Sequence, residues 1–198
     1  ANASGGDRNG GVLALAGDDH LAKSSILPAQ SEFFFEHAEM PVLNPADIQE
    51  VLDYGLHGFE LSRYAGLWTA MICLADTMDA SATISVAPQR LTFLRPDSDP
   101  WAEQDLNRVL MLGNRLETER LLRDVRIPAA QAYVRANRLD AIAFGASRPR
   151  FGIVATGKAF RDLLQALDLL GITEARARDI GLAVYKVAMP WPLEPYNF

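Results

Sequence analysis

A chain of 198 residues with 49% apolar residues is long enough for one large domain or two small ones and can bury a packed core. No apolar run reaches the ~20 residues that a membrane span requires, and the N-terminus lacks a signal segment, so no membrane association is expected. The single cysteine excludes an internal disulfide framework and fits a cytoplasmic location, while the net charge of −6 argues against nucleic-acid binding.

A polar loop directly follows the first predicted strand. Residues 12–16 are all small or apolar and predict a buried strand. The loop after it offers two carboxylates, an imidazole, an ammonium group and two hydroxyls: Asp18, Asp19, His20, Lys23, Ser24 and Ser25. Open α/β sheets build ligand sites at the carboxyl ends of their strands. The segment from Gly10 to about Gln30 is therefore expected to form one wall of a crevice.

The next elements complete the pattern of a parallel sheet. Residues 32–37 predict a short buried helix and residues 40–43 a brief strand. Asn44, followed by a proline and an acidic residue, predicts a helix cap, and helical spacing of apolar residues continues to about Gly66. Residues 67–75 are apolar on both faces and predict a central strand. Strands that alternate with helices in this way indicate a parallel sheet with helices packed on it.

The middle of the chain departs from this alternation. Residues 82–86 and 90–94 alternate well enough to predict two strands, placed at an edge of the sheet. Residues 95–100 carry two prolines, two acids and a serine, which predicts a linker and a domain boundary. Residues 106–126 predict a helix, and a second helix is expected from Pro128 to Arg138. Residues 147–150 then form a second junction.

The last section begins a new unit. Residues 151–156 predict a strand, residues 158–170 an amphipathic helix that ends at Gly171, and residues 182–187 another strand, which together make a βαβ unit. One crossover unit cannot bury both faces of its strands. We therefore expect an α/β fold in which a parallel doubly wound sheet is followed by a helical connector and an incomplete βαβ domain, with missing strands supplied by other polypeptide.

Segments of the chain match known catalytic and metal-binding motifs only in part. Gly152 to Lys158 has the spacing of a phosphate-binding loop, but strand formers occupy the positions that should form the loop, and Ala159 stands where a hydroxyl is needed. Asp18 and Asn44 resemble the Mg²⁺ pattern of thiamine-diphosphate enzymes, without its further glycine and asparagine. No residue is therefore expected to bind a metal, and no catalytic residue is assigned. The three histidines are expected at the surface or in caps, and Cys73 as an inert thiol.

Arginines are concentrated between Arg108 and Arg150. They could form a surface for phosphate or RNA, or a solvated helix face paired with the acidic residues interleaved among them. The second interpretation is favoured, because aromatic residues are not interleaved at the density of a base-stacking platform.

Long stretches of the chain, in order, resemble one family. These stretches are residues 10–20, 22–25, 30–32, 40–46, 49–50, 55–58, 132–137, 150–153, 157–159 and 191–195. The family is that of the large bacterial indolepyruvate ferredoxin oxidoreductases, which depend on thiamine diphosphate. The resemblance implies oxidative decarboxylation of an aryl 2-oxo acid, with coenzyme A as acyl acceptor and ferredoxin as electron acceptor. For the complete protein it also implies Mg²⁺, iron–sulfur clusters and a homo-oligomer.

The resemblance also assigns parts of the chain to domains. Residues 1–95 would be the C-terminal part of a pyrimidine-binding-type domain, 96–149 a linker and helical connector, and 150–198 the start of a transketolase-C-terminal-like domain. The family's catalytic residues and cofactors would then lie in the rest of the polypeptide, so the segment is expected to be inactive alone and to bind none of them. An alternative from the residues themselves is a free-standing α/β module that binds a small anion or nucleotide at the Asp18 to Ser25 loop.

Overall fold

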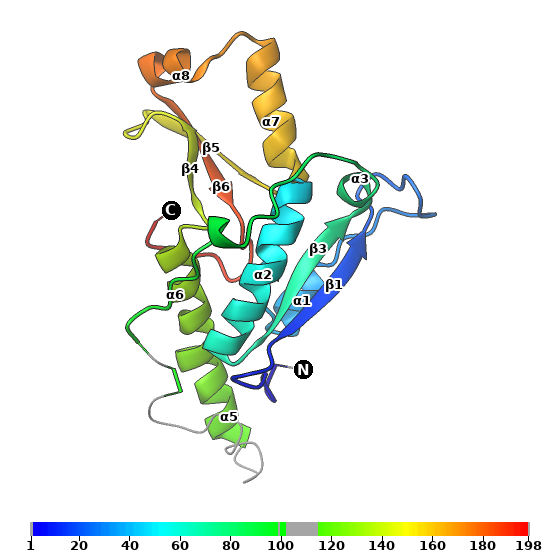
Figure 1. Ribbon diagram of the computed structural model, residues 1–198, viewed down its shortest axis with the longest axis vertical. Helices are drawn as coiled ribbons and strands as arrows, with labels where there is room; N and C mark the ends of the chain where they lie inside the picture. The colour runs from blue at the N-terminus through cyan, green and yellow to red at the C-terminus, as the bar shows by residue number, and fades with distance from the viewer. Residues whose placement is uncertain (1, 99, 102–114, 198) are drawn as a thin grey trace.

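Two small sheets and the helices around them give the molecule an elongated shape in the computed structural model, which describes residues 2–98, 100–101 and 115–197 (Figure 1). The first sheet has the strand order β1-β3-β2, and the second has the order β4-β6-β5. The second sheet lies with α7 and α8 at one end of the molecule, and α5 lies at the other. No helix in these ranges combines the length and the apolar character needed to cross a bilayer.

The first sheet is parallel, as predicted. β1 (Val12–Asp18) and β2 (Val42–Leu43) flank β3 (Trp68–Leu74), with Val12 opposite Trp68 and Val42 opposite Ala70. β3 is almost wholly buried, which confirms the predicted central strand. The predicted strand at residues 12–16 is confirmed as β1, but its predicted burial is wrong, because β1 lies at the edge of this sheet and Leu15 is 64% exposed.

Helices cover both faces of this sheet. α2 (Ile48–Ala65) and α6 (Ile127–Asn137) pack on one face, where Leu43 and Met71 join their core. α1 (Glu32–His37) covers the other through Phe35. The two cores take alternate residues of each strand, as the two-residue period of a strand requires. The predicted doubly wound α/β arrangement is thus confirmed, although α1 itself is largely exposed rather than buried.

α2 begins and ends at residues that satisfy its terminal backbone groups. The Asp47 side chain accepts a hydrogen bond from the Glu50 amide, 2.9 Å away, and caps the helix. Gly66 ends it in the left-handed conformation with φ 69°. Asn44 was predicted as the cap, and this is wrong by three residues. Its side chain instead lies against Gly157, where an added Cβ would come within 2.4 Å of Asn44 Oδ1.

The segment after β3 contains no strand in the region where two were predicted. α3 (Ala75–Met78) is followed by irregular chain and a 3₁₀ turn, η1 (Pro88–Arg90). Side-chain amides hold this segment instead of a strand ladder. The Gln49 side chain exchanges hydrogen bonds with the backbone of Ser85, and the Asn137 side chain does so with Leu94. Its polar backbone groups therefore find partners on α2 and α6 without joining a sheet.

The helical connector is continuous in its described part. α5 (Arg115–Leu121) runs through one π-helical turn, η2 (Leu122–Arg126), into α6, so the break predicted before Pro128 is absent. Most of the prediction for residues 106–114 lies outside the described residues. Arg120 pairs with Glu117 and Arg123 with Glu39, in agreement with a solvated face that carries acidic partners.

The second sheet contains the predicted βαβ unit and two elements that were not predicted. β5 (Phe151–Thr156) and β6 (Leu182–Val187) are parallel, and α7 (Gly157–Leu169) and α8 (Glu174–Ile180) form the crossover. β4 (Ala141–Gly145) pairs antiparallel with β6. α8 and β4 were not predicted from the sequence, in which only a short apolar run indicates β4. β5 is an edge strand that is mostly exposed.

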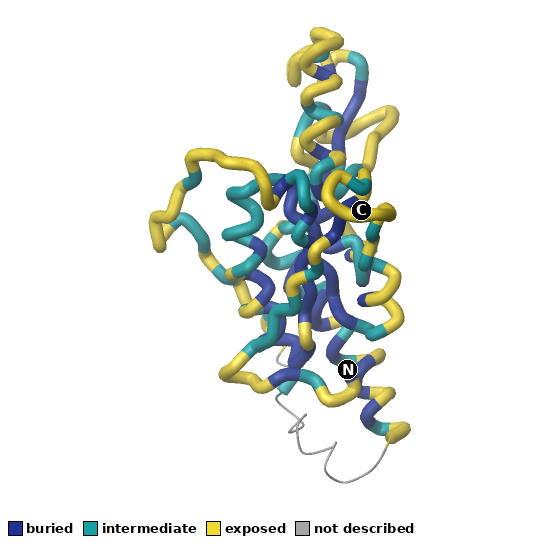
Figure 2. Tube along the Cα trace, turned by 90° about the vertical axis from the view of Figure 1, so that its right-hand side faces the viewer, coloured by how far each residue is buried: buried dark blue, intermediate teal, exposed yellow. Residues whose placement is uncertain are grey.

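The chain after β6 connects the two sheets. Ala188 accepts a hydrogen bond from the Asn44 amide at 2.8 Å, and Trp191 accepts one from the Val42 amide at 2.7 Å, so this segment lies along the free edge of β2. Ala188 and Met189 belong to the same core as α2 and α6. Buried residues accordingly form a band through the middle of the molecule (Figure 2). The boundaries at residues 95 and 149 stay a prediction.

Candidate functional site

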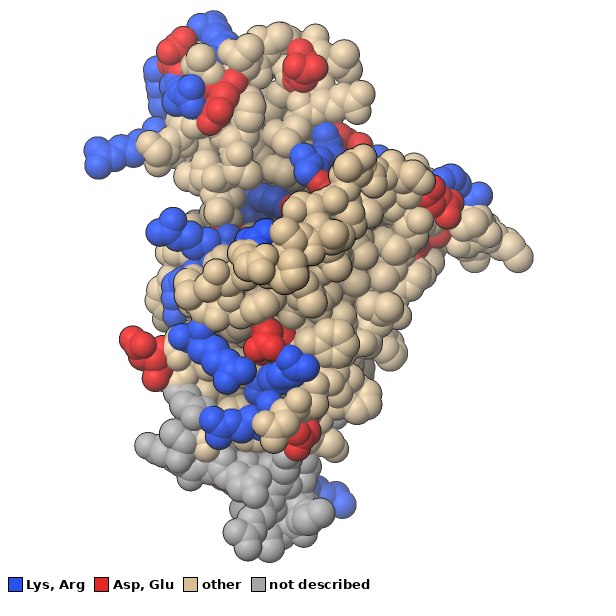
Figure 3. Space-filling model, in the orientation of Figure 1, with Lys and Arg blue, Asp and Glu red and all other residues tan. Residues whose placement is uncertain are grey.

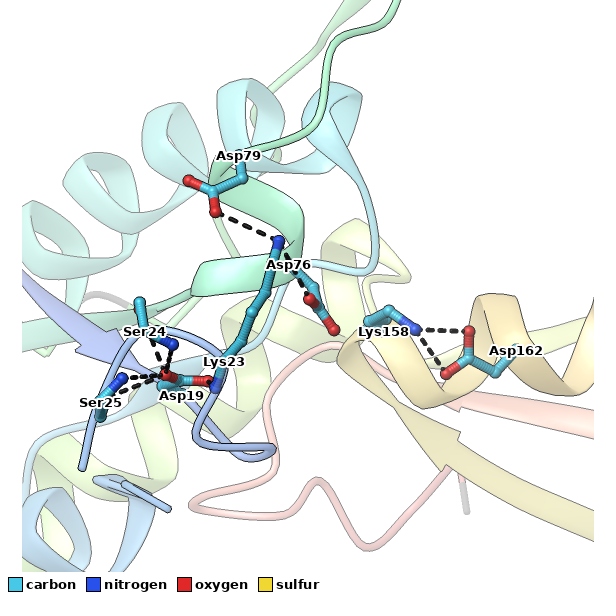
Figure 4. A network of polar contacts seen from close by, with 8 residues as sticks. All are labelled: Asp19, Lys23, Ser24, Ser25, Asp76, Asp79, Lys158 and Asp162. Carbon is cyan, nitrogen blue, oxygen red and sulfur yellow. Dashed lines mark hydrogen bonds and ion pairs between the residues drawn. The ribbon is translucent and has the colours of Figure 1, made fainter. Parts of the chain in front are cut away.

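The loop after β1 folds around the carboxylate of Asp19 (Figure 4). The backbone amides of Ser24, Ser25 and Lys23 donate to it at 2.7, 2.8 and 2.9 Å, and both serine hydroxyls donate as well. These donors, the Ser24 amide first, hold the pKa of Asp19 well below its usual range despite the desolvation that opposes them. Asp19 therefore favours its ionised form, and its carboxylate shapes this loop.

Asp18 is bonded in a different direction from its neighbour. Its carboxylate accepts hydrogen bonds from the Ser31 amide at 2.9 Å and from the Ser31 hydroxyl at 2.5 Å. Asp18 is buried, and the Nε2 of the partly exposed His20 lies 4.0 Å from Asp18 Oδ2. Asp18 thus ties the end of β1 to the start of α1.

Lys23 connects the loop to the neighbouring strand end. Its ammonium group lies 3.2 Å from an oxygen of Asp79 and 3.5 Å from an oxygen of Asp76. The hydrogen bond to Asp79 is the largest of the influences that raise the pKa of Lys23. Because α3 follows β3 directly, these contacts bring the carboxyl ends of β1 and β3 together (Figure 4).

A cavity of about 160 Å³ lies at this edge of the first sheet. Its walls come from the loop, the end of β3, α3 and the first turns of α7, through Asp19, His20, Leu21, Leu74, Asp76, Lys158, Ala159 and Asp162. The ammonium group of Lys158 pairs with Asp162 at 2.8 Å on the α7 side (Figure 4). The first sheet and the βαβ unit thus each supply one side of the cavity.

The charges around the cavity decide which groups it can accept. Three carboxylates, those of Asp19, Asp76 and Asp162, line it together with the single ammonium group of Lys158. Lys23 pairs with Asp76 but also with Asp79, a further carboxylate outside the lining, so it does not reverse the excess of negative charge. A bare anion would meet net negative charge here, whereas a cationic or hydrogen-bond-donating group would be stabilised. This balance disfavours the alternative of a small-anion or nucleotide site.

The six predicted site residues have different roles. Asp18, Asp19, Ser24 and Ser25 hold the loop in shape, and Lys23 ties it to Asp76 and Asp79. Asp19 and His20 line the cavity. Sequence reasoning missed Asp76, Lys158 and Asp162. Asp76 could have been found, because it stands just after the predicted strand 67–75, at the edge where ligands bind in such sheets.

A second cavity, of about 360 Å³, lies between α2 and the second sheet. Lys186 of β6 is buried there, donates to Tyr54 Oη at 3.0 Å and pairs with Glu50. Burial lowers the pKa of Lys186 to about 8. Figure 3 shows a hollow between the lobe that carries α7 and α8 and the body below it, with basic side chains inside. The Lys186 contacts join α2 to β6.

His57 and Cys73 are both at least partly buried. His57 is buried rather than at the surface or in a cap, and its Nδ1 lies 3.0 Å from Tyr133 Oη. Burial lowers the pKa of His57 to about 4, so the imidazole is neutral in the core. Cys73 is a half-buried free thiol, and desolvation raises its pKa, as expected of an inert cysteine.

The chain is similar to known proteins in three comparisons. Residues 141–198 match the family described as the indolepyruvate oxidoreductase domain. The indolepyruvate oxidoreductase subunit IorA of Methanothermobacter thermautotrophicus is 27% identical over 167 residues, which cover 82% of this chain and 26% of that protein. The chain thus spans about a quarter of the length of this curated relative. These matches confirm the resemblance to the indolepyruvate ferredoxin oxidoreductase family.

The chain also matches a solved structure. That structure is a 2-oxoglutarate:ferredoxin oxidoreductase from Magnetococcus marinus with 2-oxoglutarate, coenzyme A and succinyl-CoA bound. The alignment has a TM-score of 0.49 and 12% identity, and it covers 92% of this chain and 38% of that one.

Proposed function

Because the chain resembles the indolepyruvate ferredoxin oxidoreductases, we propose that it forms part of a 2-oxoacid:ferredoxin oxidoreductase. The complete protein would oxidatively decarboxylate an aryl 2-oxo acid, transfer the acyl group to coenzyme A and reduce ferredoxin. The observation that carries this proposal is the match to a curated indolepyruvate oxidoreductase subunit over 82% of the chain, supported by the family match of residues 141–198.

The part that we assign to this chain is a wall of the active site. The loop with Asp18, Asp19, His20, Lys23, Ser24 and Ser25 would face cofactor or substrate, at a part that is cationic or donates hydrogen bonds and not at their anionic groups. Its place at the carboxyl ends of β1 and β3, beside a cavity that α7 completes, supports this assignment. The dense hydrogen bonding of Asp19 would keep the wall rigid, and rigid positioning is what such a site contributes to catalysis.

The cofactors of the family do not fit the residues of this chain. Iron–sulfur clusters are held by several cysteine thiolates, and the chain has one cysteine. The carboxylates around the 160 Å³ cavity would repel a diphosphate. We therefore assign thiamine diphosphate, its Mg²⁺ and the clusters to other parts of the complete protein and attribute no chemical step to them here.

Exposed apolar groups around both sheets support packing against those other parts. Ile26 in the loop after β1 is 98% exposed, and Phe33 on α1 is 73% exposed. Phe151 and Val154 are about half exposed on the edge strand β5. Apolar surface of this kind is typical of interfaces. The remaining domains of the same polypeptide, or a second copy in a homo-oligomer, would cover it.

A dye-reduction assay tests the proposal. The complete protein is expected to reduce a viologen dye when given an aryl 2-oxo acid and coenzyme A, whereas the purified 198-residue chain gives no reduction. Failure of the complete protein with every 2-oxo acid tried would refute the assigned reaction. Reduction by the 198-residue chain alone would show that it holds the cofactors itself.

The alternative function has its own readout. If the chain is instead a free-standing anion-binding module, isothermal titration with inorganic phosphate or ATP will show saturable binding that is lost in Lys158→Met. The charges of the cavity predict no such binding.

A further inference from the structure

Three potential metal ligands meet where the first loop turns into α1. One ligand atom each from Asp18, His20 and Glu32 lies within 4.8 Å of the others. Asp18 comes from the end of β1, His20 from the loop after it, and Glu32 from the first turn of α1. We propose that these residues form a binding site for one divalent transition-metal ion, separate from the cofactors of the proposed reaction.

Glu32 supplies the first argument. Its Oε2 is buried and has no hydrogen-bond partner among the described residues. A buried carboxylate oxygen without a partner is costly, because it has lost its contacts with water and gained no hydrogen bond in return. The neighbouring carboxylate of Asp18 adds repulsion at short range. A divalent cation between the two carboxylates would remove both costs.

The surroundings of Asp18 supply the second argument. The amide and the hydroxyl of Ser31 donate to its two oxygens, and its side chain has no exposed surface. Carboxylates that bind metals are oriented by such outer hydrogen bonds, which fix the ligand before the ion arrives. Each carboxylate oxygen has two lone pairs, so Asp18 Oδ2 can accept the Ser31 amide proton and still bind an ion.

The donor set indicates the class of ion. An imidazole nitrogen with two carboxylate oxygens suits Zn²⁺ or Mn²⁺, whereas Ca²⁺ and Mg²⁺ take oxygen ligands almost exclusively. Bonds of about 2.0–2.2 Å place neighbouring ligand atoms about 3.4 Å apart in a tetrahedral Zn²⁺ site. The 4.0 Å between His20 Nε2 and Asp18 Oδ2 must shorten slightly, and the His20 side chain, 38% exposed, is free to move. With three ligands from the protein, water would take the fourth position.

Titration calorimetry on the 198-residue chain, freed of metal by a chelator, tests the proposal. Zn²⁺ alone is expected to bind with a stoichiometry of one per chain, and Mg²⁺ much more weakly. His20→Ala and Glu32→Gln should each raise the Kd at least ~10-fold, since even loss of an outer hydrogen bond costs that much. Asp18→Asn is avoided, because it would also disturb the Ser31 contacts.

Matched controls come from the same helix. His37→Ala and Glu36→Gln change an exposed imidazole and an exposed carboxylate of α1 outside the cluster, and they should leave the Kd unchanged. Circular dichroism confirms that each variant is folded. Absence of Zn²⁺ binding would overturn the proposal. So would binding that is weakened equally by His37→Ala, or that survives both His20→Ala and Glu32→Gln.

Discussion

The close approach of α2 to β1 yields the sharpest stability prediction. α2 carries two glycines one turn apart. An added Cβ at Gly58 would lie 2.7 Å from Leu13 Cδ1 of β1 and 3.4 Å from Leu43 Cδ1, whereas one at Gly55 would meet nothing within 4 Å. The same substitution to alanine therefore probes the packed face of the helix at Gly58 and its open face at Gly55.

The two substitutions are expected to change the free energy of unfolding in opposite directions. Alanine is favoured over glycine in a helix by about 1 kcal/mol, so Gly55→Ala should raise the free energy of unfolding by roughly that amount. At Gly58 the same gain is offset by overpacking, which costs about 1–3 kcal/mol. Gly58→Ala should therefore lower the free energy of unfolding by about 1 kcal/mol. For a chain of this size, each kcal/mol shifts the Tm by about 2–4 °C.

Urea unfolding followed by circular dichroism measures both effects. The double variant Gly58→Ala with Leu13→Ala removes the side chain that the new methyl group meets, so the two changes should be less destabilising together than their sum. Equal stabilisation by Gly55→Ala and Gly58→Ala would refute the argument, because it would mean that α2 does not contact β1 at this point.

Three further results are expected of the same chain. Leu61→Ala, at a fully buried site, should lower the free energy of unfolding by about 3–5 kcal/mol in urea titrations. Leu56→Ala, at a site 44% exposed, should lower it by less than ~1 kcal/mol. Similar losses for the two variants would contradict the assigned core. Burial raises the pKa of Asp140 to about 6, so its protonation stabilises the fold below about pH 4 and this contribution is lost as the pH rises through 6. Between pH 4 and 7, the free energy of unfolding of Asp140→Asn should therefore rise by up to about 3 kcal/mol relative to that of wild type. A difference between the two proteins that stays constant with pH would contradict this. Asp19→Ala should speed hydrogen exchange at the amides of residues 23–25, and unchanged protection would show that the carboxylate does not hold the loop.

Much of the fold could be predicted where one local signal agreed with the packing. β3 and α2 have strong apolar patterns, and Gly66 ends α2 as a left-handed glycine should. The βαβ unit at residues 151–187 was found for the same reason, because its strands are short apolar runs on either side of a helical pattern.

The errors arose where tertiary contacts decide between local options. Asn44 and Asp47 are both good capping residues, and only the packing of Asn44 against Gly157 leaves the cap to Asp47. Residues 82–94 have a strand-like pattern, but the Gln49 and Asn137 side chains already satisfy this segment. Burial of a strand likewise depends on its neighbours, which a pattern of apolar residues does not reveal.

In the candidate site, too, local patterns predicted some residues, whereas tertiary contacts decided the others. The carboxylates after β1 were predicted as ligand-facing groups, and the structure shows that most of their oxygens hold the loop together. Which polar groups face each other across the cavity depends on how α7 meets the first sheet. Lys158 and Asp162 are more than 130 residues away from Asp19 along the chain, so no local pattern could place them beside it.

The kinetics of a cavity-filling variant test the central claim, that this cavity forms part of the active site. Ala159 is exposed and lines the cavity, while Ala175 is exposed on α8 at the other end of the βαβ unit. In the complete protein, Ala159→Phe should lower kcat/KM for the 2-oxo acid at least ~10-fold with little change in Tm, and Ala175→Phe should leave it unaltered. Wild-type kcat/KM in a folded Ala159→Phe protein would contradict the account.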